Sequence, residues 1–92
     1  MIVDTHLHLI YRDQLSYAWL AGVPPLDADF TQETYAREAR RLGIVAALHM
    51  EVDVAEGDIA RETAMVEGLA REAGSLLAGA IAACRPELPD FP

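Results

Sequence analysis

The chain alternates short apolar runs with amphipathic stretches. The apolar runs cover residues 2–9, 44–50 and 76–84. Each run has the length of a buried strand, and the two stretches between them show helical spacing of their apolar residues. This order predicts a β-α-β-α-β arrangement, which is typical of a parallel sheet with helical crossovers. We therefore expect an α/β fold.

Capping residues define the first predicted helix, which we expect over residues 32–42. Thr31 precedes it as a candidate N-cap, and Gly43 follows it at the position where a C-terminal glycine is favoured. Phe30 and Tyr35 have the spacing of a hydrophobic staple, in which a residue before the cap packs on the first turn. The local signals at both ends agree.

The second predicted helix covers residues 59–73, with Asp58 as its N-cap and Gly74 after its end. A long connection over residues 10–30 separates the first strand from the first helix. It contains Trp19, which we expect to anchor the packing of this segment. Connections of this length without regular structure are uncommon and often functional.

Handedness limits where the helices can lie. Right-handed crossovers place both helices on one face of the sheet if the strands add in one direction. The other face, where we expect Val45 and Ala47, is then uncovered, although parallel sheets are almost always covered on both faces. A TIM (β/α)₈ barrel of about 250 residues solves this by closing the sheet. We interpret residues 1–92 as the N-terminal β-α-β-α-β part of one such domain, incomplete, which associates with itself or with the remainder of the barrel.

Composition narrows the class of partner. Of the 92 residues, 52% are hydrophobic, and seven Lys plus Arg oppose fifteen Asp plus Glu, so the net charge is −8. This charge argues against binding to nucleic acid or to an anionic membrane surface. We find no signal peptide and no membrane-spanning run. The single cysteine, Cys84, is expected to be a small buried residue. We expect a cytoplasmic protein that binds a small-molecule substrate.

Two histidines are the main candidates for chemistry. His6 and His8 alternate along the first strand with Asp4, so we expect all three side chains on one face. Their Cα atoms are then about 6–7 Å apart, which lets both imidazoles reach one metal ion. At the carboxyl end of a barrel strand they would open into the mouth of the barrel. The alternative is that they serve only as hydrogen-bonding residues in a polar loop.

Three further residues are candidates for substrate binding. His49 ends the second predicted strand and Glu51 follows it, and we expect both on the same face as Ala47, beside the two histidines of the first strand. Arg12 could pair with a substrate carboxylate through its two-pronged guanidinium group. Each has an alternative role: His49 could serve only as a hydrogen-bonding residue, Glu51 as a solvated loop carboxylate and Arg12 as a surface arginine.

The ordered set of these residues resembles a known family. Residues 2–8, Ile-Val-Asp-Thr-His-Leu-His, resemble the opening strand of the amidohydrolase superfamily, which consists of metal-dependent hydrolases on a TIM barrel. Residues 17–20, 26–30 and 43–51 look like the amidohydrolase-related branch that contains fuconolactonase-like and 2-pyrone-4,6-dicarboxylate lactonase-like proteins. Glu62 also matches that branch, and the resemblance covers nearly the whole chain.

The resemblance implies hydrolysis of a lactone or a similar cyclic ester or amide. His6 and His8 match paired histidines that bind a divalent metal in many members, with zinc the ion we expect. Some lactonases work without metal, and there the same histidines contact substrate. The other ligands and the catalytic base come from later strands, so we expect this chain alone to be inactive. The alternative is a non-catalytic fragment that binds metal or a partner chain.

Overall fold

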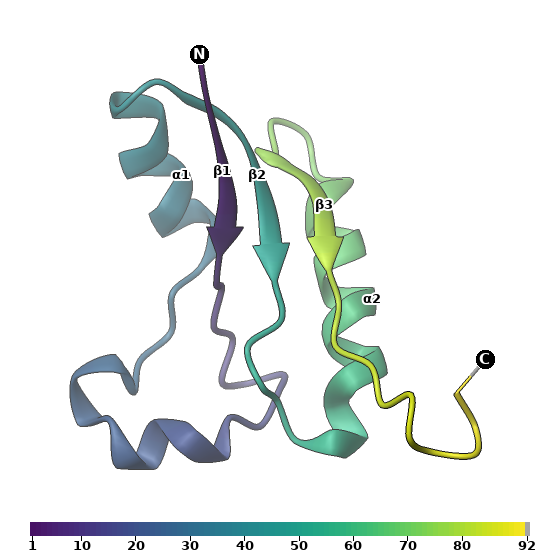
Figure 1. Ribbon diagram of the computed structural model, residues 1–92. Helices are drawn as coiled ribbons and strands as arrows, with labels where there is room; N and C mark the ends of the chain where they lie inside the picture. The colour runs from purple at the N-terminus through teal and green to yellow at the C-terminus, as the bar shows by residue number, and fades with distance from the viewer. Residues whose placement is uncertain (92) are drawn as a thin grey trace.

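A computed structural model describes residues 1–91 of the chain. Its elements follow the predicted β-α-β-α-β order, with short 3-10 helices in the connections (Figure 1). The three strands are β1 (Ile2–Leu7), β2 (Ile44–Met50) and β3 (Leu77–Ile81), and the two α-helices are α1 (Gln32–Arg41) and α2 (Ile59–Ala70). The 3-10 helices are η1 (Ala18–Gly22), η2 (Pro24–Leu26) and η3 (Glu56–Asp58).

The three strands form one parallel sheet in the order β1-β2-β3. Both α-helices lie on the same face of this sheet, because Tyr35 from α1 and Val66 from α2 pack on one hydrophobic cluster that contains Ala47 of β2. Figure 1 shows the strands in front of the helices, with no helix on the near side of the sheet. The predicted order and the predicted uncovered face are therefore confirmed for the described residues.

The register of β1 changes along the strand. Asp4 pairs with Ala47 and Leu7 with His49, so three steps on β1 match two on β2. This irregularity turns Asp4 toward α1, where it accepts a hydrogen bond of 2.8 Å from the Tyr35 hydroxyl. The expectation that Asp4 shares a face with the two histidines is therefore wrong.

The covered face of β2 also differs from the prediction. Ala47 is fully buried and packs with Val66 and Leu77 on the helix side of the sheet. Ala46, Leu48 and Met50 alternate with these positions, and each is partly exposed on the uncovered face. Ala47 was expected on the uncovered face, and that expectation is wrong because Ala47 pairs with Asp4, which faces α1, and paired residues leave the sheet on the same side.

The predicted features at the ends of α1 are confirmed. The Thr31 side chain accepts a hydrogen bond from the backbone N–H of Thr34, as an N-cap does. Gly43 has a φ of 81°, the left-handed conformation that glycine adopts after a helix. The rings of Phe30 and Tyr35 meet edge to face with centroids 6.4 Å apart, which is the expected staple.

The predictions for the later elements need three corrections. Helix α2 ends at Ala70 rather than at residue 73. Asp58 makes no side-chain capping bond, because its Oδ2 accepts a hydrogen bond of 2.8 Å from the backbone N–H of Ser16. Strand β3 ends at Ile81, so Cys84 lies beyond the sheet and is exposed rather than buried.

None of the helices within residues 1–91 combines the length and the apolar character that crossing a bilayer requires. The cytoplasmic location stays a prediction.

The uncovered sheet face generates a prediction about association. Leu48 and Met50 lie partly exposed on it, and a large apolar side chain gains about 1.5–3 kcal/mol when it is buried. We expect the purified chain to self-associate, and Leu48→Gln to reduce that association. Light scattering over a concentration series measures both, with Arg37→Gln on the exposed side of α1 as the control. A wild-type chain that stays monodisperse and monomeric would contradict the prediction.

Candidate functional site

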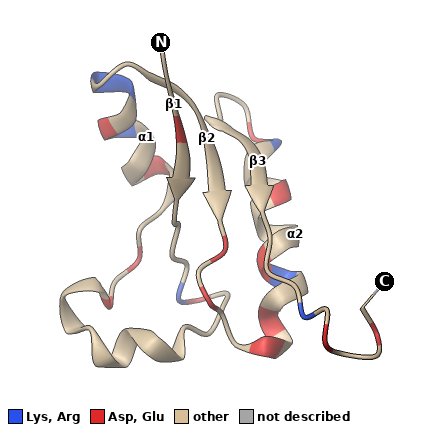
Figure 2. Cartoon of the chain, viewed as in Figure 1, with Lys and Arg blue, Asp and Glu red and all other residues tan. Residues whose placement is uncertain are grey.

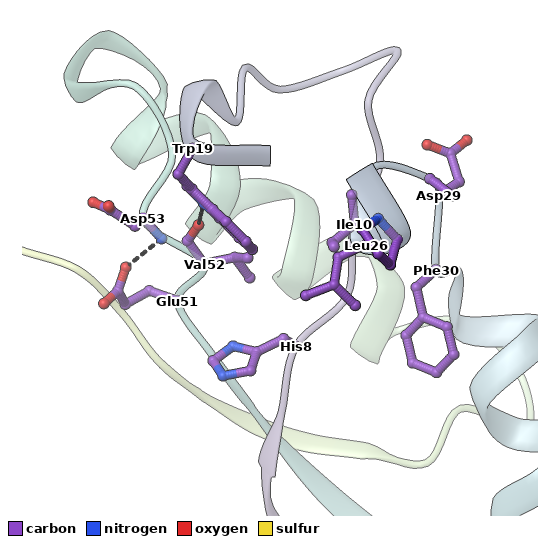
Figure 3. Close-up of a pocket in the computed structure, with 11 residues that line it drawn as sticks. His8, Ile10, Trp19, Leu26, Asp29, Phe30, Glu51, Val52 and Asp53 are labelled. Carbon is purple, nitrogen blue, oxygen red and sulfur yellow. Dashed lines mark hydrogen bonds between the residues drawn. The ribbon is translucent and has the colours of Figure 1, made fainter. Parts of the chain in front are cut away.

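The carboxyl ends of β1 and β2 and the long connection enclose a cavity of about 570 Å³ (Figure 3). Its walls are mainly apolar, with a few polar side chains. The connection over residues 10–30 therefore forms one wall of a candidate site. The lining residues are His8, Ile10, Trp19, Pro25, Leu26, Ala28, Asp29, Phe30, Glu51, Val52 and Asp53.

His6 and His8 face each other at the carboxyl end of β1. Their Nε2 atoms are 3.0 Å apart, and the His8 Nδ1 lies 3.0 Å from the carbonyl oxygen of Met50. Because a carbonyl only accepts, the His8 Nδ1 carries a hydrogen, so in neutral His8 the Nε2 carries a lone pair. The Nε2 of His6 then donates to it. Both side chains are exposed and alternate with buried Leu7, so they lie on the uncovered face.

The histidine pair fits two positions of a divalent metal site. The bond to Met50 orients the His8 ring with its Nε2 lone pair toward His6, as outer hydrogen bonds commonly do for metal-binding histidines. Binding through both Nε2 atoms requires His6 to move its hydrogen to Nδ1. A four-coordinate zinc needs further ligands, and residues 1–91 contain no group of three or more His, Cys, Asp or Glu side chains that could hold a metal ion.

His49 lies on the other side of the sheet from this pair. It is 1% exposed and lines a small second cavity with Glu62 and Val66 of α2. The predicted convergence of His49 with His6 and His8 is therefore wrong. The cause is the register, since His49 pairs with Leu7, and paired residues leave the sheet on the same side. Burial lowers the pKa of His49, which favours the neutral imidazole.

Glu51 lies in the predicted neighbourhood of His8. Both side chains line the large cavity, and the Glu51 Oε2 accepts a hydrogen bond of 2.8 Å from the backbone N–H of Asp53. Asp53 has a φ of 50°, a conformation that turns the chain sharply after β2. Figure 2 shows acidic residues in this loop, and Glu51 and Asp53 both line the cavity, so this rim of the cavity is negatively charged.

Arg12 lies outside the lining of the large cavity. Its Nη1 is 3.0 Å from the Asp27 Oδ1, and its backbone N–H donates to the Asp29 Oδ1 at 2.9 Å. These contacts tie the start of the long connection to its end. The surface-arginine alternative therefore agrees with this arrangement, in which Arg12 supports the wall of the cavity.

Glu62 was not predicted as a site residue from its chemistry. It is 3% exposed, and its Oε2 accepts a hydrogen bond of 3.1 Å from the backbone N–H of Val52, a residue of the cavity wall. A signal was present, since Glu62 occupies the apolar stripe of α2 together with Ile59 and Val66. A carboxylate buried in such a stripe destabilises the folded chain unless it has a hydrogen-bond or ion-pair partner.

Buried Glu62 generates a prediction about pH. Burial raises the pKa of Glu62 above its usual 4.5, against a smaller opposite effect of the Val52 N–H. The folded chain therefore holds this proton more tightly than the unfolded chain does. Its contribution to the free energy of unfolding is present below about pH 4.5 and is lost as the pH rises through the folded pKa.

Urea unfolding at a series of pH values tests this prediction. We expect Glu62→Gln to remove that part of the pH dependence, because glutamine does not titrate. Glu67→Gln, a substitution on the exposed side of the same helix, should leave the dependence unchanged. Parallel pH profiles for wild type and Glu62→Gln would contradict the prediction.

Comparisons with protein-family models and with curated proteins found no match. Among solved structures, the chain is similar to Amidohydrolase 2 from Bifidobacterium longum subsp. infantis, with a TM-score of 0.71 and 26% sequence identity. The similarity covers 88% of this chain and 32% of that protein. The three-stranded open sheet thus matches a part of an amidohydrolase barrel, which confirms the predicted fold class. The match supports a relation to hydrolases, and the lactonase branch stays a prediction.

Proposed function

We propose that this chain contributes part of the active site of a hydrolase that acts on a lactone or a similar cyclic ester or amide. The observation that carries the proposal is the facing pair of His6 and His8, with Nε2 atoms 3.0 Å apart, of which His8 opens into a cavity of about 570 Å³. The structural similarity to an amidohydrolase supports the reaction class. The lactone substrate is our own assignment.

The cavity suits a small cyclic substrate. Its volume lies within the range of about 300–1,000 Å³ that is usual for small-molecule sites. Ile10, Trp19 and Leu26 provide apolar walls for a ring, and His8 with Glu51 provides polar groups at one end. We assign substrate contact to Glu51 rather than to Arg12 or His49, because only Glu51 of these three lines the cavity.

The histidine pair is placed to act on a carbonyl. In the neutral pair the His6 Nε2–H is donated to the His8 Nε2. A substrate carbonyl oxygen that entered between the two rings would replace His8 as the acceptor of this hydrogen, as would the oxyanion formed from it. A divalent ion held by His6 and His8, for which zinc is the expected choice, would supply Lewis-acid polarisation of the same oxygen. The Met50 carbonyl holds His8 in one orientation for either role.

The first test is metal binding. We expect the chain to bind one zinc ion, and His6→Ala or His8→Ala to weaken binding at least about tenfold, because each removes a direct ligand. Isothermal titration calorimetry measures the affinity. The control is Cys84→Ala, because an exposed thiol is the competing soft ligand. Unchanged zinc affinity in both histidine variants, or a loss confined to the cysteine variant, would contradict this prediction.

The second test separates substrate binding from turnover. Trp19 is the only tryptophan and lines the cavity, so its fluorescence reports occupancy. We expect a neutral γ-lactone to change this fluorescence, with weaker binding in His8→Ala. We expect no acid release above background in a pH-stat assay, because we expect the general base to come from later strands of the barrel, and a general base alone contributes about 10²–10⁴ in rate.

Turnover that is abolished by His8→Ala would show that this chain alone is sufficient, against our expectation. A chain that binds neither lactone nor zinc would contradict the proposed function. That outcome would favour the non-catalytic alternative, a fragment that binds a partner chain. The specific observation behind this alternative is the uncovered sheet face with partly exposed Leu48 and Met50.

A further inference from the structure

A buried carboxylate stands behind the wall of the large cavity. Glu62 is 3% exposed, and its hydrogen bond within residues 1–91 comes from the backbone N–H of Val52 at 3.1 Å. A carboxylate offers about four acceptor positions, and burying it with few partners is costly. An apolar residue would fill this position of the α2 stripe at lower cost, so the interaction with Val52 needs an explanation beyond packing.

The Val52 backbone connects Glu62 to the cavity. While its N–H donates to Glu62, its carbonyl oxygen accepts a hydrogen bond of 2.9 Å from the indole Nε1 of Trp19. Val52 and Trp19 both line the cavity, and Figure 3 shows the indole extending along its wall toward the loop after β2. A helix on the covered side of the sheet is thus coupled through one residue to an aromatic ring of the site.

The partner of Glu62 across the small cavity is His49. The His49 Nε2 is buried and has no hydrogen-bond partner among the described residues. The cavity lies among β2, α2 and β3, and its polar lining residues are His49, Glu51, Glu62 and Thr63. It has a volume of about 10 Å³. This is near the lower limit of about 10–15 Å³ for one water molecule. A water can donate to Glu62 and can also bond to the imidazole nitrogen in either tautomer.

We propose that Glu62 is a positioning residue that fixes Trp19 through the Val52 backbone, and that one buried water between His49 and Glu62 holds the carboxylate in place. The proposal rests on the proposed function only in treating the large cavity as a ligand site. The ordering of Trp19 itself can be measured without any ligand.

The experiment compares Glu62→Ala, Glu62→Gln and the exposed control Glu67→Ala. Glutamine keeps an oxygen that accepts from Val52, whereas alanine does not. We expect Glu62→Ala to raise the acrylamide quenching constant of Trp19 about twofold and to weaken γ-lactone binding about tenfold, because a loosened wall loses its preorganisation. Glu62→Gln should restore both values. Lower thermal stability in Glu62→Ala with unchanged Trp19 quenching would overturn the proposal.

A second variant, Glu62→Asp, keeps the proposal testable if Glu62→Ala does not fold. Glu62→Asp keeps the charge and shortens the side chain, so it should also loosen Trp19. Trp19→Phe lacks the indole donor, so adding Glu62→Asp to it should change lactone affinity little further. Calorimetry measures the affinity in these variants, because they have no tryptophan fluorescence. Additive losses in this double-mutant cycle would overturn the proposal.

The water is tested directly by nuclear magnetic resonance. We expect a long-lived water to give cross-relaxation to the His49 ring hydrogens in the wild type, and this signal to be lost in Glu62→Leu, which keeps the imidazole and removes the carboxylate. Absence of that signal in the wild type would overturn the water bridge. If the wild type binds neither lactone nor zinc while Trp19 quenching follows the predicted order, the proposed function fails and the positioning role of Glu62 stands.

Discussion

The hand of the β-α-β crossover is the constraint on which the other features depend. Right-handed crossovers between strands added in one direction place α1 and α2 on one face, and parallel strands bring their carboxyl ends to one edge. The histidine pair, the loop after β2 and the long connection meet at that edge for this reason. The same constraint leaves the opposite face uncovered, so one topological rule produces both a candidate site and a sheet face with partly exposed apolar side chains.

The sequence was sufficient for the features that depend on local interactions. The order of the elements, the Thr31 cap, Gly43 and the contact between Phe30 and Tyr35 involve residues close together in the chain, so their patterns determine them. His6 and His8 were also recognised as a pair, because an alternation within one strand places both on one side.

The features that failed depend on contacts between distant segments. The register shift in β1 separates Asp4 from the histidines, and it depends on the pairing with β2. His49 was assigned to the wrong face because a strand with apolar residues on both sides has no pattern that identifies its covered face. Asp58 has the position of a cap, but Ser16, distant in sequence, competes successfully for its carboxylate. Tertiary hydrogen bonds overrode local preference in this case.

The large cavity depends on polar groups that lie behind its walls. Asp58 binds the backbone of Ser16 and Glu62 binds the backbone of Val52, so two carboxylates near the start of α2 hold two segments that enclose the cavity. Apolar side chains could fill such positions with equal or greater stability, since burying ionisable groups is costly. They could not select one backbone position through a directional bond to a particular N–H. We infer that α2 contributes to the site by fixing the geometry of its loops, since the side chains that line the large cavity come from other segments.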